Sequence, residues 1–329
     1  MIVSAFKQSP KYIKWLSRIG PAALLIVFMY FLAKSYAGNE WLIQIKKTPP
    51  DLLIFLGLLS LSNYLLRTLR WFLLFRAVGV DLSFKTTFYS YFSGFSMAVT
   101  PGKIGEVIRI WVLRRSENIP VKKSIYPVFG DRVTDLIAVS MLSTLGLGMF
   151  ENVLIPGMVA IFITCFSALI WLFPNYSIAV ILKFIRLFNL RLLKIVKLLL
   201  AIKRETRTVK SNPYSQINII ISLLAWLMES IAFYLLLLEL GVEVQFAVAA
   251  SIFAISILVG AISMMPGGIG GTEVVMVTLL LIINVNISTA IAATAIIRAL
   301  TLWFAVVIGL MTMPFALRYK NPLIDDKSR

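Results

Sequence analysis

The two halves of this 329-residue chain carry the same landmarks in the same order. Each half places a Pro-Gly break inside apolar sequence and a lone arginine in the apolar stretch that follows. The matched landmarks are GVDLSF at 79–84 with GVEVQF at 241–246, PGKIG at 101–105 with PGGIG at 266–270, and Arg132 with Arg298, at offsets of 162, 165 and 166 residues. Paired hydrophobic segments interrupted by glycine and proline mark the binding site of many transporters. The repeat therefore favours a protein that moves something over one that makes something.

The composition is that of an integral membrane protein. Hydrophobic residues make up 59% of the chain, above the roughly 45–50% of soluble domains, and the mean hydropathy is +0.89. The net charge of +17 then favours membrane topology and attraction to an anionic leaflet over nucleic-acid binding. The chain has no histidine, which excludes histidine acid–base catalysis and histidine metal sites, and its single cysteine, Cys165, cannot form an internal disulfide. We expect no metal, no cofactor and no nucleic-acid partner.

Apolar segments of two lengths define the expected fold. A helix needs about 20 apolar residues to cross the bilayer core, and six segments meet this requirement, at 17–36, 51–78, 124–149, 152–173, 215–240 and 288–317. Two further regions are broken into arms, at 86–100 and 103–115 and at 246–265 and 271–284. The shorter arms reach only about 18–21 Å, less than the roughly 30 Å core. The sequence predicts an all-α polytopic membrane protein with about six transmembrane helices plus two re-entrant helical hairpins; two short tilted spans per broken region are the alternative.

Basic residues indicate the orientation. By the positive-inside rule, the N-terminus, the loop near 114–123, the segment 174–214 and the tail after 317 face the cytoplasm. We therefore predict an integral protein of the plasma (inner) membrane with both termini in the cytoplasm. The first hairpin then enters from the cytoplasm and the second from outside, so the repeat is inverted, as alternating access requires.

We treat residues 1–329 as a single membrane domain. Its parts are an N-terminal span and outer loop (1–50), repeat A (51–149, broken near 100–105), a connecting span (150–173), a basic cytoplasmic segment (174–214), repeat B (215–317, broken near 265–271) and a cytoplasmic tail (318–329). Segment 174–214 spaces several of its basic residues three to five apart among apolar ones. This pattern is typical of an amphipathic helix on the inner membrane surface.

Ionisable residues within the apolar segments are the first site candidates, because each costs roughly 2.5–3.5 kcal/mol at depth and needs a partner or a cavity. We expect Arg132 to pair with Asp135, three residues on along one helix face, and Asp131 to point elsewhere.

A second set of ionisable residues lies in the other half. Arg298 is deep enough to need a partner, and Glu229 is the candidate; by the offset of 162, Glu229 corresponds to Arg67. Two interpretations stay open for both sets, ion pairs that hold helices together or contact with a substrate or ion.

The first break carries the sharper chemistry. A helix is expected to begin at about 103–105, and its N-terminal N–H groups and the positive end of its dipole suit a phosphate or carboxylate. Lys103 adds a full charge, Arg109 lies within the same helix, and Arg132 is expected to converge on it. The candidate head-group residues at this break are Pro101, Gly102, Lys103, Gly105, Glu106, Arg109 and Arg132.

The second break has no basic residue of its own. Its glycines allow close approach of backbone to a ligand, Thr272 is the expected N-cap of the next helix, and Glu273 lies in the favourable first turn. The candidate head-group residues here are Pro266, Gly267, Gly268, Gly270, Thr272, Glu273 and Arg298.

Four motifs resemble the transmembrane region of the lysylphosphatidylglycerol synthase family. They are RWFLLFRAVGV at 70–80, TPGKIGE at 100–106, Asp131-Arg132 and MPGGIGGTE at 265–273, and the likeness runs from about residue 15 to 318. It implies the flippase half of the bacterial enzymes that make aminoacylated phosphatidylglycerol; the family also has stand-alone members and members fused to glycosyltransferases that act on polyprenyl-phosphate carriers. Because only a short tail follows residue 317, the likeness implies a flippase domain without the aminoacyl-transferase domain.

We therefore expect a lipid flippase that moves the head group of an anionic phospholipid or a polyprenyl-phosphate-linked glycolipid, with no catalytic residue. Two alternatives stay open. One is a membrane transferase on a lipid-phosphate carrier, with Asp131, Asp135 or Glu106 as base or metal ligand. The other is a non-catalytic scaffold that recruits a glycosyltransferase through segment 174–214. Expected partners are membrane lipids with anionic head groups and a glycosyltransferase or other envelope-synthesis enzyme; the sequence leaves self-association open.

Overall fold

The computed structural model describes residues 40–100, 104–146, 166, 214–263 and 265–319, and every regular element within these ranges is a helix. This agrees with the expected all-α class. Several predictions lie outside the described residues: the spans at 17–36 and 152–173, the basic segment 174–214, nearly all of the tail, and the tip of the first break at 101–103.

The described helices fall into two sets that follow the two sequence repeats. The first set is α4 (Pro50–Ala77), α5 (Phe84–Phe95), α6 (Ile104–Glu117), the short turn η2 (Val121–Ser124) and α7 (Ile125–Thr144). The second set is α11 (Tyr214–Glu239), α12 (Phe246–Ile262), η4 (Pro266–Gly268), α13 (Gly271–Ile282), α14 (Ile287–Arg298), the π-helical turn η5 (Ala299–Trp303) and α15 (Phe304–Arg318). The short helix α3 (Glu40–Lys47) precedes both and packs on α14. We call the two sets half A and half B.

Three stretches of the described chain are long and apolar enough to cross a membrane: Pro50–Ala77, Gln216–Glu239 and Ile287–Arg318. They correspond to the predicted spans 51–78, 215–240 and 288–317. Helix α7 lies within the predicted segment 124–149, of which 147–149 are outside the described residues; its 20 residues include three charged side chains, Asp131, Arg132 and Asp135, and it is not among the three spans. The arms of the two broken regions form separate helices of 12 to 17 residues.

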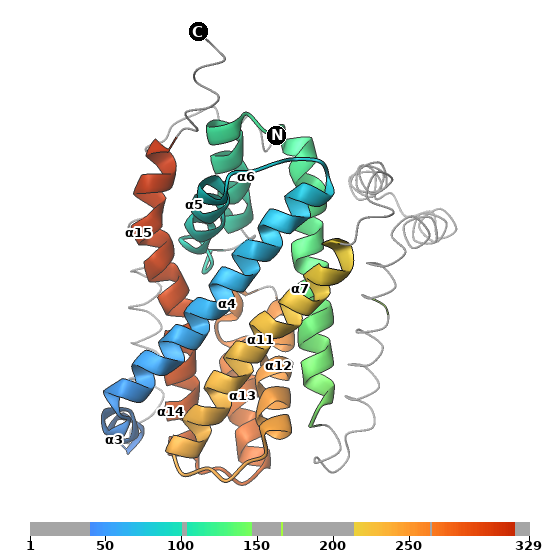
Figure 1. Cartoon of the computed structure of the whole chain (residues 1–329). Coiled ribbons are helices and arrows are strands. Elements are labelled where there is room, and N and C mark those ends of the chain that lie inside the picture. The colour runs from blue at the N-terminus through green and yellow to red at the C-terminus, as the bar shows by residue number, and fades with distance from the viewer. Residues whose placement is uncertain (1–39, 101–103, 147–165, 167–213, 264, 320–329) are drawn as a thin grey trace.

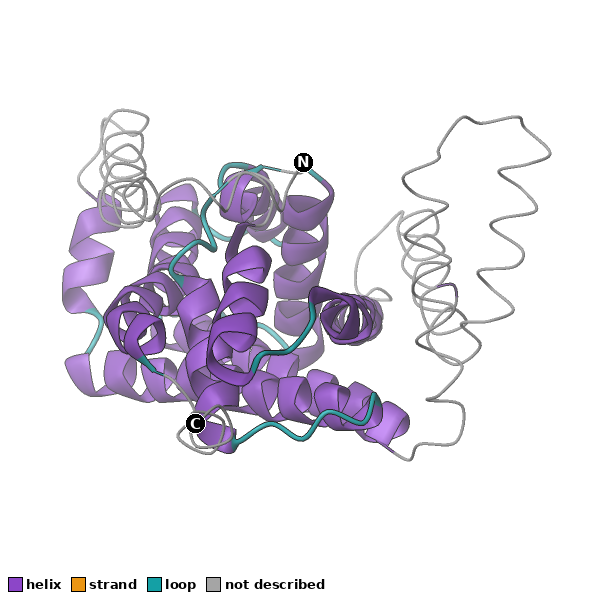
Figure 2. Cartoon of the chain, turned by 90° about the horizontal axis from the view of Figure 1, so that it is seen from above, coloured by secondary structure: helices purple, strands orange, loops and turns teal. Residues whose placement is uncertain are grey.

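The two halves run in opposite directions. In Figure 1, α4 rises while α11 descends beside it, and α7 descends while α15 rises. The α5–α6 hairpin occupies the upper part of the molecule and the α12–α13 pair the lower part. Each hairpin packs against the last helix of the other half, α5 on α15 and α12 on α7, and from above the described helices form one bundle (Figure 2).

The contact between α4 and α11 identifies where the halves meet. The side-chain amide of Asn63 donates to the carbonyl oxygen of Ala225 at 2.7 Å. These residues are 162 positions apart, which is the offset between the repeated motifs. Equivalent residues of two-fold-related halves come together only near the axis, so this contact is what a pseudo-two-fold axis between α4 and α11 would produce.

The repeated Gly-Val motif encodes the same helix ending twice. Gly79 and Gly241 have φ of 70° and 76°, a left-handed conformation that glycine adopts without steric cost. After α4, the N–H of Val80 bonds to the carbonyl of Phe75 and that of Gly79 to Arg76, and Val242 and Gly241 repeat the pattern after α11. This is the Schellman ending, and in each half it turns the chain into the first arm of the hairpin.

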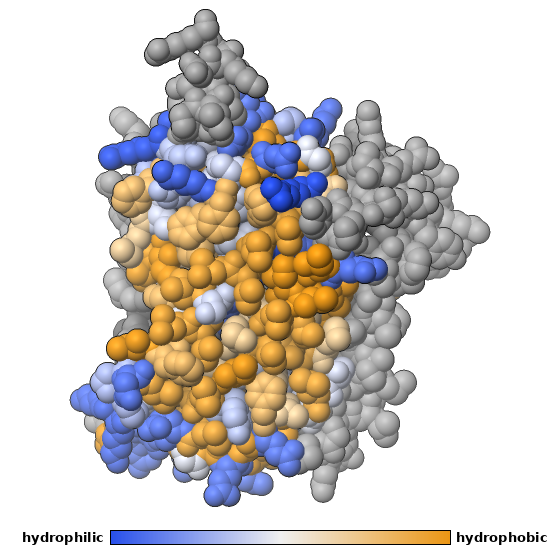
Figure 3. Space-filling view, in the orientation of Figure 1, coloured by the Kyte–Doolittle hydropathy of each residue, from blue (hydrophilic) through white to orange (hydrophobic). Residues whose placement is uncertain are grey.

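The surface agrees with a membrane environment. Figure 3 shows a broad apolar band over the middle of the visible face, with hydrophilic residues gathered at both ends. Large apolar side chains are exposed along the long helices, among them Ile54, Leu58, Ile220, Val307, Met311 and Phe315. Such a continuous apolar surface would be an aggregation liability in water and fits contact with lipid chains.

Glycines set the close approach of the two arms within each hairpin. A Cβ atom at Gly105 in α6 would collide with the carbonyl oxygen of Gly94 in α5. In the second hairpin, a Cβ atom at Gly260 in α12 would collide with the hydroxyl of Thr272 in α13. Both hairpins therefore need small residues at the crossing.

We expect Gly105→Ala to lower the thermal stability of the detergent-solubilised protein, by an overpacking cost of about 1–3 kcal/mol, because the colliding atom is backbone and cannot rotate away. Gly57→Ala is the matched control, since a Cβ atom at Gly57 meets nothing within 4 Å. Equal unfolding midpoints for the two variants would contradict the close crossing of α5 and α6.

Candidate functional site

The second break is described in full and adopts a tight glycine turn. Gly267, Gly268 and Gly270 have φ of 61°, 68° and 88°, so side chains other than glycine would be strained at each. Helix α13 then begins at Gly271.

The structure contradicts the prediction that Thr272 is the N-cap of α13. Gly270, not Thr272, is the N-cap residue, and Thr272 is buried in the first turn with its hydroxyl against Gly260. Glu273 takes the capping role, because its Oε2 accepts from the Gly270 N–H at 2.6 Å. The glycine turn brings the chain into the helix two residues earlier than the threonine pattern indicates.

The chain just before the first break approaches the second break through apolar atoms. A Cβ atom at Gly267 would lie 3.2 Å from Cγ1 of Val99, which lies two residues before Pro101. Val99 belongs to a small apolar cluster with Trp303 and Val306, against which Ile269 packs. In the first break, α6 begins at Ile104, within the predicted range, while Pro101, Gly102 and Lys103 lie outside the described residues.

A glutamate–arginine pair ties each hairpin to the helix that follows it. In half A, Nε of Arg132 lies 2.6 Å from Oε1 of Glu106. In half B, Nε of Arg298 donates to Oε1 of Glu273 at 2.6 Å. Each glutamate is the third residue of the second hairpin helix, and the arginines are the matched pair of the repeat. The two halves therefore build the same contact with equivalent residues.

The prediction that Glu229 is the ion-pair partner of Arg298 is therefore wrong. Its side chain, 5% exposed, pairs with Glu273 rather than Glu229 and also donates to the carbonyl oxygen of Gly267 at 2.8 Å. Glu229 is buried and lies in electrostatic range of Arg67 and Arg298. Arg298 contacts its own hairpin because Glu273 lies in the first turn of α13, next to the break. The depth of Arg298 along its own helix does not reveal that Glu273 is close to it.

Half A holds a larger charged group at the level of Arg132. Arg70 on α4 is fully buried and donates to Asp131 at 2.5 Å, to Asp135 at 2.7 Å and to the hydroxyl of Ser222 on α11. The expectation that Asp131 points away from Asp135 is therefore wrong. Residues four apart stack on one helix face, and Arg70 bridges both carboxylates.

Two more arginines join the same carboxylates. Arg67 donates to Asp135 at 2.5 Å and lies over the ring of Trp226, whose Nε1 donates to Asp135 at 2.9 Å. Arg109 donates to Asp131 at 3.2 Å and lies 3.8 Å from the ring centroid of Tyr91. These bonds hold α4, α6, α7 and α11 together.

Arg132 completes this group, which we call the basic cluster: Arg67, Arg70, Arg109, Arg132, Glu106, Asp131 and Asp135. Its four arginines contact three carboxylates, and the buried Glu229, in electrostatic range of Arg67, is a fourth carboxylate outside these contacts. Arg132 is the most exposed of these arginines, with 37% of its side chain accessible, against 12% or less for the others. The expected contact of Arg132 with Asp135 is present but long, at 3.9 Å, and Asp131 lies at 3.5 Å.

Sequence reasoning did not select Arg70, Ser222 or Trp226 as site residues. One signal was available for Arg70, since it lies three residues after Arg67 on the same face of α4 and so faces the same partner. No local pattern distinguishes Ser222 or Trp226 from other residues of an apolar helix, because their role depends on where α11 packs.

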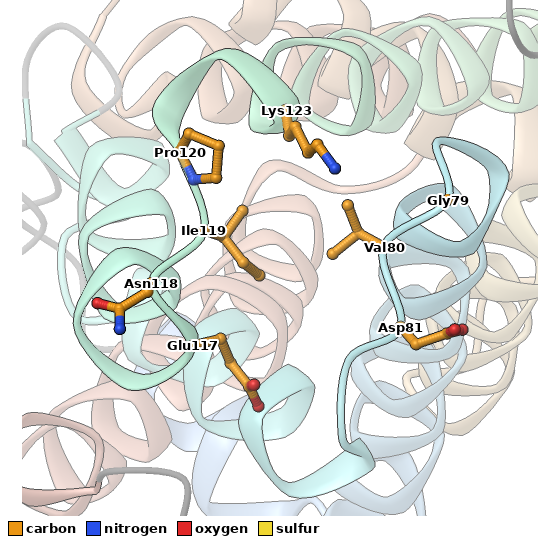
Figure 4. A pocket seen from close by; sticks show the side chains of 8 residues that line it. All are labelled: Gly79, Val80, Asp81, Glu117, Asn118, Ile119, Pro120 and Lys123. Atoms are coloured by element: carbon orange, nitrogen blue, oxygen red, sulfur yellow. The ribbon is translucent and has the colours of Figure 1, made fainter. Parts of the chain in front are cut away.

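A pocket of about 350 Å³ lies outside this group, between the α4–α5 loop and the segment that joins α6 to α7 (Figure 4). Val80, Ile119 and Lys123 point toward one another there, and Asp81 points away. The pocket contains none of the predicted site residues. In the part of the chain that the structure describes, no group of acidic or cysteine side chains is placed to hold a metal ion.

We expect Arg70→Met to destabilise the protein by about 3–5 kcal/mol, because it removes the fully buried guanidinium that bridges Asp131 and Asp135 and leaves both carboxylates without its hydrogen bonds. Arg132→Met should cost about 1 kcal/mol or less, since its side chain is partly exposed. Thermal unfolding in detergent measures both, and similar midpoints for the two variants would contradict the different roles assigned to these arginines.

The comparisons with known proteins agree with the motifs. A sequence model described as the lysylphosphatidylglycerol synthase TM region matches residues 18–309. A UPF0104 membrane protein of Methanothermobacter thermautotrophicus is 25% identical over 82% of this chain and 87% of its own length. UPF0104 membrane protein PH1989 of Pyrococcus horikoshii is 25% identical over 90% of this chain and 95% of its own length. UPF0104 membrane protein MJ1595 of Methanocaldococcus jannaschii is 23% identical over 88% of this chain and 93% of its own length. With its helical fold, its apolar spans and a family match over most of its length, this chain belongs to the lysylphosphatidylglycerol synthase transmembrane-region family of integral membrane proteins.

Proposed function

We propose that this protein is a flippase, which moves the phosphate-bearing head group of a lipid across the membrane. The substrate would be an anionic phospholipid or a polyprenyl-phosphate-linked glycolipid. One observation carries the proposal: the Glu106–Arg132 contact and the Glu273–Arg298 contact are built by equivalent residues in halves that run in opposite directions. Each pair lies beside the break of its own hairpin, so the inverted repeat would offer a head group one such contact on each side of the membrane.

The route depends on the two hairpins entering the membrane from opposite sides. The arms of 12 to 17 residues correspond to about 18–26 Å of helix, shorter than the bilayer core. We treat them as re-entrant hairpins whose broken ends meet near Val99 and Gly267. The inverted arrangement of halves then permits two conformations, one open to each side.

The basic end of the molecule faces the cytoplasm in this proposal. The end of α6 and the turn η2 carry Arg114, Arg115, Lys122 and Lys123, and the positive-inside rule places such residues in the cytoplasm. Both termini then lie in the cytoplasm, and the membrane is the plasma (inner) membrane. The partly exposed guanidinium of Arg132 is available to a phosphate, while the acyl or prenyl chain stays in lipid. An envelope-synthesis enzyme, such as a glycosyltransferase, would supply or use the translocated lipid.

Translocation of fluorescent phosphatidylglycerol in proteoliposomes tests the proposal. We expect Arg132→Gln and Arg298→Gln each to slow transfer roughly 10- to 100-fold, as loss of a charge-assisted contact of about 1.5–3 kcal/mol implies. Arg76→Gln is the matched control, because Arg76 is exposed and pairs only loosely, at 3.7 Å, with the exposed Asp81.

Wild-type protein that does not raise transfer above that of empty vesicles, for either phosphatidylglycerol or a polyprenyl-phosphate sugar, would rule out the flippase function. Wild-type transfer with unchanged rates in both arginine variants would instead remove these residues from the pathway. Circular dichroism and unfolding midpoints confirm that each variant is folded.

A further inference from the structure

Arg132 differs from the other arginines of the basic cluster in how its guanidinium is used. Arg67, Arg70 and Arg109 each donate at least one hydrogen bond to a cluster carboxylate. Arg132 contacts three carboxylates, at 2.6, 3.5 and 3.9 Å, yet no contact with a described residue is aligned as a hydrogen bond. A guanidinium offers five N–H donors in a fixed fork, so its capacity to bind an anion is largely unused.

Glu106 occupies the position that an anion would take. Its Oε1 lies 2.6 Å from Nε of Arg132, and this buried oxygen has no hydrogen-bond partner. Carboxylates and phosphates are recognised by arginine with the same planar donor geometry. Glu106 is therefore a poorly bonded chemical equivalent of a phosphate, on a side chain that is 20% exposed.

The equivalent pair in half B, Arg298 and Glu273, is covered and hydrogen-bonded. Arg298 is 5% exposed, donates to Glu273 through Nε at 2.6 Å and donates to the carbonyl oxygen of Gly267 at 2.8 Å. One molecule thus contains a covered, hydrogen-bonded pair and a partly exposed pair whose two contacting atoms are buried and not hydrogen-bonded, made by equivalent residues. An access state that differs between the halves accounts for both.

We propose that Glu106 is an internal competitor for the head-group site, which holds the guanidinium of Arg132 until a lipid phosphate displaces it. Glu273 plays the same part for Arg298 when half B is the accessible one. The ligand class, a phosphodiester of a membrane lipid, rests on the proposed function. The competition itself rests on the contacts of Glu106 and Arg132. The displaced Glu106 carboxylate stays on α6, where its partly exposed side chain can be solvated by water.

A binding experiment tests the competition without requiring transport. The full-length protein, in micelles of a zwitterionic detergent, is titrated with dihexanoyl phosphatidylglycerol, and the shift of the unfolding midpoint reports the apparent affinity. We expect Glu106→Gln to bind about two- to fivefold more tightly than wild type, the range that loss of a partly exposed ion pair implies. Glu106→Asp, with a shorter carboxylate, should fall between them.

Two controls fix the interpretation. Arg132→Gln should lose most of the lipid-dependent shift, and it should do so in the Glu106→Gln background as well. Glu239→Gln removes an exposed carboxylate at the end of α11 and should bind like wild type. The midpoints without lipid show whether each variant is folded, and Glu106→Asp keeps the test valid if Glu106→Gln is unstable.

Unchanged or weaker binding by both Glu106→Gln and Glu106→Asp would overturn the proposal. That result together with wild-type lipid transfer in proteoliposomes would leave the flippase function in place. The expected order of affinities without any lipid transfer would support the competitor role and reject translocation, so the two failures are distinguishable.

Discussion

The complete burial of the Arg70 guanidinium is the constraint on which the rest of the structure depends. A charge removed from water costs several kcal/mol unless opposite charges and hydrogen bonds surround it. Asp131 and Asp135 provide both, and they do so only when α7 lies beside α4 at one height and one rotation. Ser222 extends the same requirement to α11, and Arg109, through Asp131, extends it to the first hairpin. Apolar packing alone would allow these helices to slide or rotate against one another, because lipid and protein interior are equally apolar.

The two halves share their backbone plan but not their charge. Both end their first helix in the same glycine turn, cross their hairpin arms at small residues and tie the hairpin to the following helix through a glutamate–arginine pair. Half A surrounds that pair with three further arginines, whereas Arg298 is the one arginine that contacts Glu273; Glu229 is in electrostatic range of both Arg67 and Arg298. A head group that moved between equivalent positions would therefore lie near four arginines at one end of the proposed route and near one at the other.

The elements were largely predictable, and the contacts between them were not. The predicted segments 51–78 and 215–240 match α4 and α11 to within a residue or two, because long apolar runs bounded by loops have few other conformations in a membrane protein. Predictions of ion-pair partners from the position of a residue along its helix were less accurate. Glu229 was expected to hold Arg298, and Glu273 does so instead, since the glycine turn returns the chain toward α14. Which glutamate pairs with Arg298 depends on the path of the loop between α12 and α13, and the spacing of residues in the sequence does not describe that path.

The sequence by itself determined the membrane class, the paired breaks, the two-fold repetition and the arginines at matched positions, because composition, glycine and proline act locally. Only the tertiary structure decided that Arg70 is the centre of the basic cluster, that α11 supplies Ser222 and Trp226 to it, and that Arg132 is accessible where Arg298 is covered. These properties depend on which helices lie side by side and at what rotation. Two halves with nearly the same local pattern can therefore present one covered and one partly exposed version of the same pair.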